Sequence, residues 1–238
     1  SHSYIAEPKW SAPGQDHLVF DTEIGKIAIL ICMDIHFIET ARLVALKKAD
    51  IIIHISNWLG ERTPGPYWIS RAFENGCYLI EGNRWGLERT VQFSGGSCVI
   101  NPDGSIASVI DKGDGLAYAD IDISWSRKRQ VLNEKIFDDR RPEMYLNLPT
   151  NPYLWNPLDF FGLYGMNPLP KGKESLVSIV QMNTTNNVNQ NLKEILKHLQ
   201  IAKNNSSELV VFPELALTGH LNKNKSAISK NSSEISQL

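Results

Sequence analysis

Short apolar runs alternate with amphipathic segments along the first part of the chain. Residues 27–31 and 51–55 are apolar at nearly every position, a pattern typical of strands that are buried on both faces of a sheet. Between them, the spacing of apolar residues over 39–48 predicts a helix, and a shorter helix is expected over 69–75. Because strands alternate with helices, the pattern predicts an α/β fold.

Turn residues predict where further strands begin and end. Gly25 is expected to join two strands within residues 19–32. The Pro-Asp-Gly turn within residues 101–104 predicts a hairpin made of strands 97–100 and 105–110. The same reasoning predicts two more strands, at 77–81 and 117–123, and a basic helical segment over 124–133.

The region after residue 148 differs in kind. Residues 149–174 hold five prolines and five aromatic residues with little periodicity, which predicts an ordered linker. Beyond it we expect a strand over 175–182, an amphipathic helix over 188–202 and a buried strand over 209–212. The chain is therefore predicted to have three parts: 1–148, 149–174 and 175–238.

The composition is that of a globular protein, and it excludes some partners. Of the 238 residues, 42% are hydrophobic and 21% are charged, and the formal net charge is -2 with a pI near 6.3. Because no basic face is implied, neither nucleic acid nor a membrane is expected as a partner. The chain opens with Ser1 rather than Met, so we expect a piece of a longer protein or a processed product.

The three cysteines, Cys32, Cys77 and Cys98, are an odd number and show no C-x-x-C spacing. This disfavours both a disulfide framework and a zinc site. Free thiols suit a reducing compartment, so the sequence predicts a cytoplasmic location.

Two reactive side chains follow predicted strands. Cys32 lies between an apolar strand and the polar start of a helix, where backbone N–H groups stabilise a thiolate and a developing oxyanion. A buried core cysteine is the alternative. Glu214 follows Pro213, which ends a strand because it cannot donate a ladder hydrogen bond, so its carboxylate suits a general base at the sheet edge. A helix N-terminal Glu is the alternative there.

Several motifs together resemble one known family. Residues 25–34, with 37–39 after them, resemble the nucleophile motif of the nitrilase (carbon–nitrogen hydrolase) superfamily, and residues 209–219 resemble its general-base motif. Further similar segments are 56–58, 71–75, 83–86 and 140–145. The resemblance covers nearly the whole chain apart from the linker.

The resemblance implies an αββα sandwich in which the thiolate of Cys32 attacks an amide or nitrile carbon. It implies that Glu214 is the general base and that the backbone N–H of Met33 helps to hold the oxyanion. Glu7 resembles a second acidic residue of the family, which lines the pocket and helps to position substrate. A solvated loop carboxylate is the alternative for Glu7.

Other polar and aromatic residues are expected to shape or support the pocket. Asn57 and Trp58 end their strand at the same edge as Cys32 and are predicted pocket walls. His36 follows Cys32 by four residues, so a helix would place both on one face, but we expect it to be a wall residue. His54 is expected to be a core histidine whose hydrogen bonds are satisfied. Structural ion pairs and hydrogen bonds are expected of Arg71, Glu74, Asn83 and Arg84.

The order of the motifs differs from that of the family, in which the Glu segment comes first, a Lys segment next and the Cys segment last. We therefore expect residues 1–148 to be the C-terminal two thirds of a nitrilase-like domain and 175–238 to be the N-terminal part of one. The chain is then either a junction of two tandem domains or a circular permutant. No residue is assigned to the family's Lys, since Lys9 lies beyond the expected position and the segment ending at Ser1-His2 would carry it upstream.

These observations predict an amidase-type carbon–nitrogen hydrolase that cleaves a small amide or carbamoyl compound through a thioester on Cys32. Amidase is favoured over nitrilase because most of the family cleaves amides. No metal and no organic cofactor are needed, and association into a homo-oligomer is expected. The alternatives are a catalytically inactive fragment or pseudoenzyme with an assembly role, and a Cys–His hydrolase that uses His36.

Overall fold

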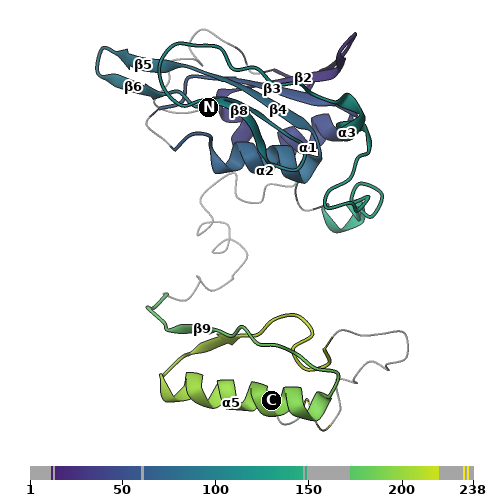
Figure 1. Cartoon of the computed structure of the whole chain (residues 1–238), viewed down its shortest axis with the longest axis vertical. Coiled ribbons are helices and arrows are strands. Elements are labelled where there is room, and N and C mark those ends of the chain that lie inside the picture. Colours follow the sequence, from purple (N-terminus) through teal and green to yellow (C-terminus); the bar gives the residue numbers. More distant parts are fainter. Residues whose placement is uncertain are drawn as a thin grey trace, which may run out of the picture. The chain divides into compact units, whose positions relative to one another are not determined.

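The chain separates into two compact units, residues 1–150 and 151–238 (Figure 1). The computed structural model describes residues 12, 14–59, 62–146, 148, 172–219, 233 and 235. In each unit, helices pack against one face of a sheet, as expected of α/β proteins. Within the described ranges, no helix has the length and apolar character needed to cross a membrane.

The first unit is built on a mixed six-stranded sheet. Its strands lie in the order β1-β2-β3-β4-β7-β8, in which β2, β3 and β4 are parallel and the outer pairings are antiparallel. The strands are β1 (Val19–Thr22), β2 (Gly25–Ile31), β3 (Ile51–Ser56), β4 (Tyr78–Asn83), β7 (Ser97–Ile100) and β8 (Ile106–Ile110). The carboxyl ends of the parallel strands meet at one edge, where open α/β sheets bind their ligands.

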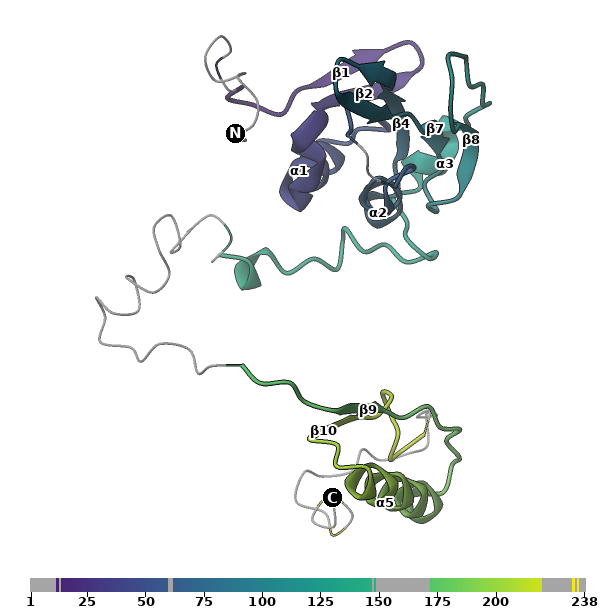
Figure 2. The ribbon, with the colours of Figure 1, turned by 90° about the vertical axis from the view of Figure 1, so that its left-hand side faces the viewer.

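Two helices cover one face of this sheet. Helix α1 (Ile38–Leu46) connects β2 to β3, helix α2 (Pro66–Asn75) connects β3 to β4, and both lie on the same side (Figures 1 and 2). Pro66 suits the first turn of α2, and Gly76 ends that helix with a left-handed φ of 57°. The buried core between sheet and helices includes Ala28, Leu30, Ile52, Leu79, Ile100, Ala41, Val44, Trp68 and Ala72.

The opposite face of the sheet is apolar and remains open within this unit. Ile29, Ile31 and Ile55 are 47%, 55% and 45% exposed. They lie side by side, because Ile31 pairs with Ile55 and Ile29 pairs with Ile53 in the parallel register. The prediction that these strands are buried on both faces is therefore wrong for the unit by itself, since α1 and α2 both pack on the other face.

Two regions differ from the predicted secondary structure. Strands β5 (Trp85–Glu88) and β6 (Val91–Ser94) form a hairpin that was not expected from the sequence. Residues 117–123, expected to be a strand, instead lead into the short helix α3 (Ile123–Arg127). The hydroxyl of Tyr78 fastens this segment, because it accepts from the N–H of Asp122 at 3.0 Å and lies 3.1 Å from its carbonyl oxygen. The Tyr78 hydroxyl thus fastens this segment where the backbone hydrogen bonds of a strand were expected.

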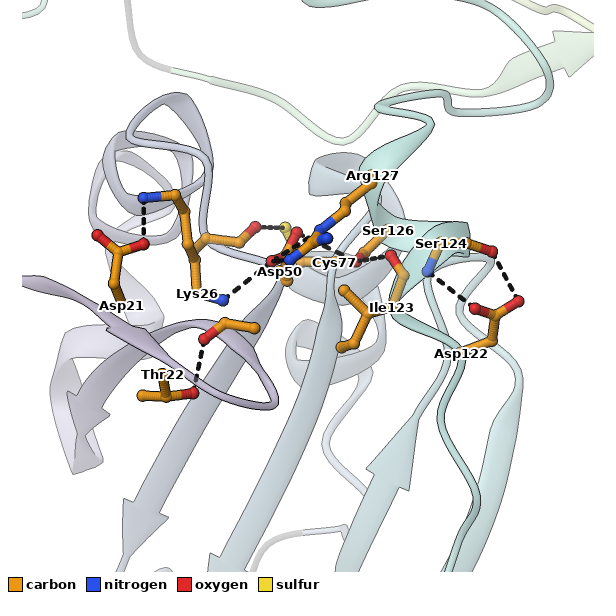
Figure 3. A network of polar contacts seen from close by, with 12 residues as sticks. Asp21, Thr22, Lys26, Asp50, Cys77, Asp122, Ile123, Ser124, Ser126 and Arg127 are labelled. Atoms are coloured by element: carbon orange, nitrogen blue, oxygen red, sulfur yellow. Dashed lines mark hydrogen bonds and ion pairs between the residues drawn. The ribbon is translucent and has the colours of Figure 1, made fainter.

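A buried carboxylate ties together the amino ends of the strands. Asp50 precedes β3, is 1% exposed, and accepts a hydrogen bond from the backbone N–H of Lys26 at 2.9 Å. Arg127 approaches one of its oxygens at 3.4 Å (Figure 3). Arg129 approaches the other oxygen at 3.4 Å, and the two contacts fasten the segment after α3 to the sheet. The network lies at the opposite end of β3 from the edge described above, and its role is structural.

The second unit places one helix against a small parallel sheet. Strand β9 (Val177–Ile179) pairs with β10 (Leu209–Val211), and helix α5 (Val188–Asn204) connects them (Figure 2). Leu192 and Ile195 of α5 are 5% and 2% exposed and form the apolar interior of this unit.

The outer face of the second sheet is also open. Its side chains are exposed at Val177, Ile179, Leu209 and Val211. The register aligns Leu209 with Val177 and Val211 with Ile179, so the four form one apolar patch. The prediction of a buried strand at 209–212 is therefore wrong within this unit, because a single helix covers only one face of a sheet.

Replacing Asp50 by Asn keeps the size of the side chain and removes the charge that Arg127 and Arg129 face. We expect the free energy of unfolding to fall by about 2 kcal/mol, because hydrogen bonds to a charged group are weakened at a buried position. Urea unfolding of the variant beside the original chain measures this change. Arg127→Gln is the control: its side chain is 62% exposed, so we expect a loss below about 1 kcal/mol. Equal losses in the two variants would contradict a central role for Asp50.

Candidate active site

Cys32 lies directly after β2, at the carboxyl edge of the parallel strands, and is partly exposed. Its φ of 48° is in the left-handed region, which costs a residue with a Cβ about 1–2 kcal/mol. It also begins the 3₁₀ helix η2 (Cys32–His36), whose first N–H groups have no partner within the helix. A strained residue between a strand and a helix is a common position for a nucleophile, since the turn presents its side chain above the sheet.

Side chains from two directions hold this turn in place. The carboxylate of Asp34 accepts a hydrogen bond from the backbone N–H of Ile31 at 2.9 Å. From helix α2, Arg71 donates to the carbonyl oxygen of Ile35 at 3.1 Å, and Glu74 pairs with Arg71 at 2.9 Å. The structural role predicted for Arg71 and Glu74 is thereby confirmed.

His54 in β3 also contacts the backbone of this turn. This residue is 0% exposed, and its Nε2 lies 2.8 Å from the carbonyl oxygen of Cys32. Its Nδ1 contacts Oε2 of Glu81 in β4, which is 3% exposed. His54 is therefore a core histidine with both ring nitrogens bonded, as the sequence predicted.

The same network continues through Ser56 and Asn83. The hydroxyl of Ser56 contacts Oε1 of Glu81 and lies 2.9 Å from Oδ1 of Asn83. That Oδ1 also accepts from the backbone N–H of Trp58 at 2.8 Å, which fixes the orientation of the Asn83 amide. A series of polar contacts thus runs from the carbonyl of Cys32 to the backbone of Trp58, across the carboxyl ends of β2, β3 and β4.

Three aromatic rings stack beside the turn. The ring of His36 lies 5.0 Å from that of Trp58, at an interplanar angle of 15°, and 4.9 Å from that of Tyr67. Because η2 is a 3₁₀ helix with three residues per turn, Cys32 and His36 do not share a face as they would in an α-helix. The shared α-helical face expected from the spacing of Cys32 and His36 is therefore not formed, and the ring of His36 stacks on Trp58 instead.

The other two thiols differ from Cys32 in their environment. All three cysteines are free, but Cys77 is 0% and Cys98 is 2% exposed. Burial raises the pKa of both thiols to about 12, and the nearby Glu81 contributes to the raised pKa of Cys98. In the part of the chain that the structure describes, no group of His, Cys, Asp and Glu is arranged to hold a metal ion.

Glu214 belongs to the second unit, where it follows β10 and is exposed. The turn that carries it is fixed by the buried Asn191 of α5, whose amide donates to the carbonyls of Thr185 at 2.8 Å and Leu217 at 3.0 Å. Gly219 ends this turn with a φ of 65°, and a Cβ there would lie 2.4 Å from the carbonyl oxygen of Thr185. The side chain of Glu214 is thus presented from a fixed loop after a strand.

The remaining predicted site residues lie at the same edge of the first unit or outside the described part of the chain. Met33 is the second residue of η2 and is partly exposed. Asn57 follows β3 and is exposed, whereas Trp58 is 4% exposed. Glu7 and Lys9 lie outside the described residues.

The connection from His54 to Cys32 was not found from the sequence. The available signal was a pair of polar residues at alternate positions of two apolar strands, His54 with Ser56 and Glu81 with Asn83. Alternate residues of a strand lie on the same face. The parallel register of β3 and β4 places His54 beside Glu81 and Ser56 beside Asn83, so only the pairing of the two strands reveals the network.

Comparison with known proteins relates the chain to the carbon–nitrogen hydrolase family. The sequence model of the carbon–nitrogen hydrolase family matches residues 2–129 and 176–238. A nitrilase of Pyrococcus abyssi is 35% identical over 148 residues, which are 60% of this chain and 56% of that protein. Deaminated glutathione amidase of Homo sapiens is 31% identical over 154 residues, 62% of this chain and 44% of that protein. The chain spans about half the length of the curated relatives it matches.

Solved structures of an amidase from Nesterenkonia sp. AN1 are also similar. One, a variant in complex with butyramide, has a TM-score of 0.51 and 26% identity, covering 62% of this chain and 53% of that one. Another has a TM-score of 0.51 and 28% identity, covering 60% and 52%. The second shows covalent addition of the acetamide moiety of fluoroacetamide at the active-site cysteine of that enzyme.

The environments of the three thiols predict selective chemical modification. At neutral pH, we expect iodoacetamide to label Cys32 and leave Cys77 and Cys98 unlabelled, because a thiol with a pKa of about 12 is almost entirely protonated and both are buried. Peptide mass spectrometry of the folded chain identifies the labelled residue. Labelling in urea, where all three should react, is the control. Labelling of Cys77 or Cys98 at the rate of Cys32 in the folded chain would contradict the prediction.

Proposed function

Because the chain belongs to the carbon–nitrogen hydrolase family, we propose that it hydrolyses a small amide through a thioester on Cys32, with Glu214 as the general base. The observation that carries the proposal is the Cys32 turn. A partly exposed thiol, in a strained conformation, is held by hydrogen bonds at the carboxyl edge of parallel strands. A nucleophile gains from such a fixed position, because correct orientation lowers the barrier of attack.

In the first half of the reaction, the carboxylate of Glu214 takes the proton of the Cys32 thiol, and the sulfur attacks the amide carbon. The carbonyl oxygen becomes an oxyanion, and the backbone N–H of Met33, at the start of η2, is the donor that we assign to it. The carbon–nitrogen bond then breaks while Glu214 returns its proton to the leaving nitrogen. Ammonia or an amine departs, and the acyl group stays on sulfur.

In the second half, water replaces the amine. Glu214 removes a proton from the water molecule, and the oxygen attacks the thioester carbon. The carbon–sulfur bond breaks, and the thiolate of Cys32 takes back the proton from Glu214. The carboxylic acid leaves, both side chains return to their first state, and the cycle needs no metal and no organic cofactor.

The substrate class rests on the relatives. The amidase of Nesterenkonia sp. AN1 has been solved with butyramide, a small aliphatic amide, and with an acetamide moiety on its cysteine. We propose an amide rather than a nitrile on this basis. Glu7 is proposed to help position the substrate, and Asn57 and Trp58 are proposed as pocket walls.

The proposal requires that a first unit and a second unit act together, because Cys32 belongs to one and Glu214 to the other. Each unit by itself leaves an apolar sheet face open, at Ile29, Ile31 and Ile55 in the first and at β9 and β10 in the second. Burying such apolar area is favourable by about 25 cal/mol per Å². Association of copies into a homo-oligomer would be one way to bury this apolar area.

The decisive measurement of function is ammonia release from a panel of small aliphatic amides and carbamoyl compounds. We expect the Cys32→Ala variant to lose more than about 1000-fold in kcat/KM, because no nucleophile remains. Glu214→Gln should lower kcat by about 100-fold or more, because the general base is lost. The matched control is Glu208→Gln, which alters an exposed carboxylate of the same unit that pairs with Lys173.

Each outcome has a defined meaning. Turnover that survives in Cys32→Ala would contradict the nucleophile assignment, and equal effects of the Glu214 and Glu208 changes would contradict the general base. If the unaltered chain releases no ammonia and Cys32 is alkylated no faster than Cys77 and Cys98, the alternative of an inactive assembly protein is favoured.

Mixing two inactive variants distinguishes pairing within a chain from pairing between chains. If the units pair between two copies, an equimolar mixture of Cys32→Ala and Glu214→Gln should recover about a quarter of the original activity, because half of the dimers are mixed and each has one intact site. The chains are mixed in mild denaturant and then refolded before ammonia release is measured. Pairing within a chain predicts that the mixture stays as inactive as its components.

A further inference from the structure

We propose that the buried pair of His54 and Glu81 is a positioning device for the nucleophile. The Nε2–H of His54 holds the carbonyl of Cys32, and Glu81 keeps the imidazole in the orientation that this contact needs. The inference rests on the proposed role of Cys32, but its central test does not depend on turnover.

The contact with Cys32 determines which ring nitrogen of His54 carries a proton. The carbonyl oxygen of Cys32 can only accept a hydrogen bond, and it lies 2.8 Å from Nε2 of His54. A bare Nε2 at this distance would bring two acceptors together in the protein interior, where unpaired polar groups are costly. Nε2 must therefore be protonated and act as the donor.

The other ring nitrogen of His54 faces the carboxyl group of Glu81. Nδ1 contacts Oε2 of Glu81, and neither side chain is solvated. Either Nδ1–H donates to a carboxylate, or a carboxylic acid donates to Nδ1. In both arrangements Nε2 carries a proton. The carbonyl of Cys32 is what excludes the tautomer with a bare Nε2, and the contact with Glu81 fixes the orientation of the ring.

The pair of His54 and Glu81 supports the backbone conformation of Cys32. Cys32 has a φ of 48°, a conformation that persists only where its surroundings hold it. Asp34 and Arg71 hold the residues on either side, at Ile31 and Ile35, while His54 is bonded to the backbone of Cys32 itself. The His54 contact therefore acts directly on the backbone of the strained residue.

The pair of His54 and Glu81 also bears on the free energy of unfolding. A buried ion pair often contributes little to the free energy of unfolding, because the cost of removing its charges from water offsets their attraction. His54 lies between apolar residues of β3, and its ring meets the rings of Trp58 and Trp68 edge to face. What the pair adds is a fixed geometry that links Cys32, through Ser56 and Asn83, to the pocket wall at Trp58.

The test compares two substitutions of His54 in the full chain. His54→Phe keeps a planar ring and removes the donor, whereas His54→Gln places an amide N–H near the position of Nε2. We expect His54→Phe to lower the rate of iodoacetamide alkylation at Cys32 by about tenfold, and His54→Gln to recover most of that loss. Where turnover is measurable, kcat should fall about 10- to 100-fold in His54→Phe while KM changes by less than about threefold.

The control variant is Asp50→Asn, which alters a buried carboxylate at the opposite end of β3. It should lower stability without changing the alkylation rate of Cys32. The inference is overturned if folded His54→Phe alkylates as fast as the original chain, or if His54→Gln is as slow as His54→Phe. Absence of amide turnover would count against the proposed function alone, since the alkylation comparison stands without it.

A second measurement uses the unaltered chain and remains decisive if His54→Phe does not fold. Long-range ¹H–¹⁵N spectra of histidine-labelled protein report which ring nitrogen is protonated. We expect His54 to show a protonated Nε2 at neutral pH. A spectrum with a bare Nε2 and a protonated Nδ1 would overturn the inference.

Discussion

The left-handed conformation of Cys32 is the constraint around which the first unit is arranged. A residue with a Cβ adopts it only when other contacts offset a cost of about 1–2 kcal/mol. Those contacts come from three separate elements: Asp34 within the turn itself, Arg71 from α2, and His54 from β3. The sheet and the helix thus act together on one residue, and the proposed nucleophile depends on tertiary packing for its orientation.

Strand β3 carries polar residues at both ends and an apolar stretch between them. Before its amino end, Asp50 gathers backbone and arginine donors and fastens the segment after α3 to the sheet. Near its carboxyl end, His54 and Ser56 join the network that reaches Cys32. Because the two networks are separated by the length of the strand, substitutions at one end should separate stability from reactivity at the other.

The two open sheet faces give the division of the chain a physical meaning. Parallel strands rich in Ile and Val are normally covered on both sides, and here each unit covers only one. Each unit therefore presents apolar surface that its own helices leave uncovered.

The sequence by itself determined the α/β class, the strands and helices around the parallel sheet, and the two motifs that carry the family resemblance. These follow from local spacing of apolar residues and from residue types at strand ends, which a linear pattern records. It predicted a strand at 117–123 where the structure has none, because alternation alone does not supply a partner strand. It predicted buried strands whose outer faces are open, because hydrophobicity does not say what covers a surface.

Only the tertiary structure decided how the site is supported. Cys32 and His54 are 22 residues apart, and His54 and Glu81 are 27 apart. No local pattern joins them, because their proximity arises from the parallel register of β3 with its two neighbours. His36 shows the opposite relation between local spacing and structure. Its spacing from Cys32 predicted a shared helical face, but η2 is a 3₁₀ helix and the ring of His36 stacks on Trp58 instead. Residue types set which chemistry is available, whereas strand pairing and helix type set which side chains meet.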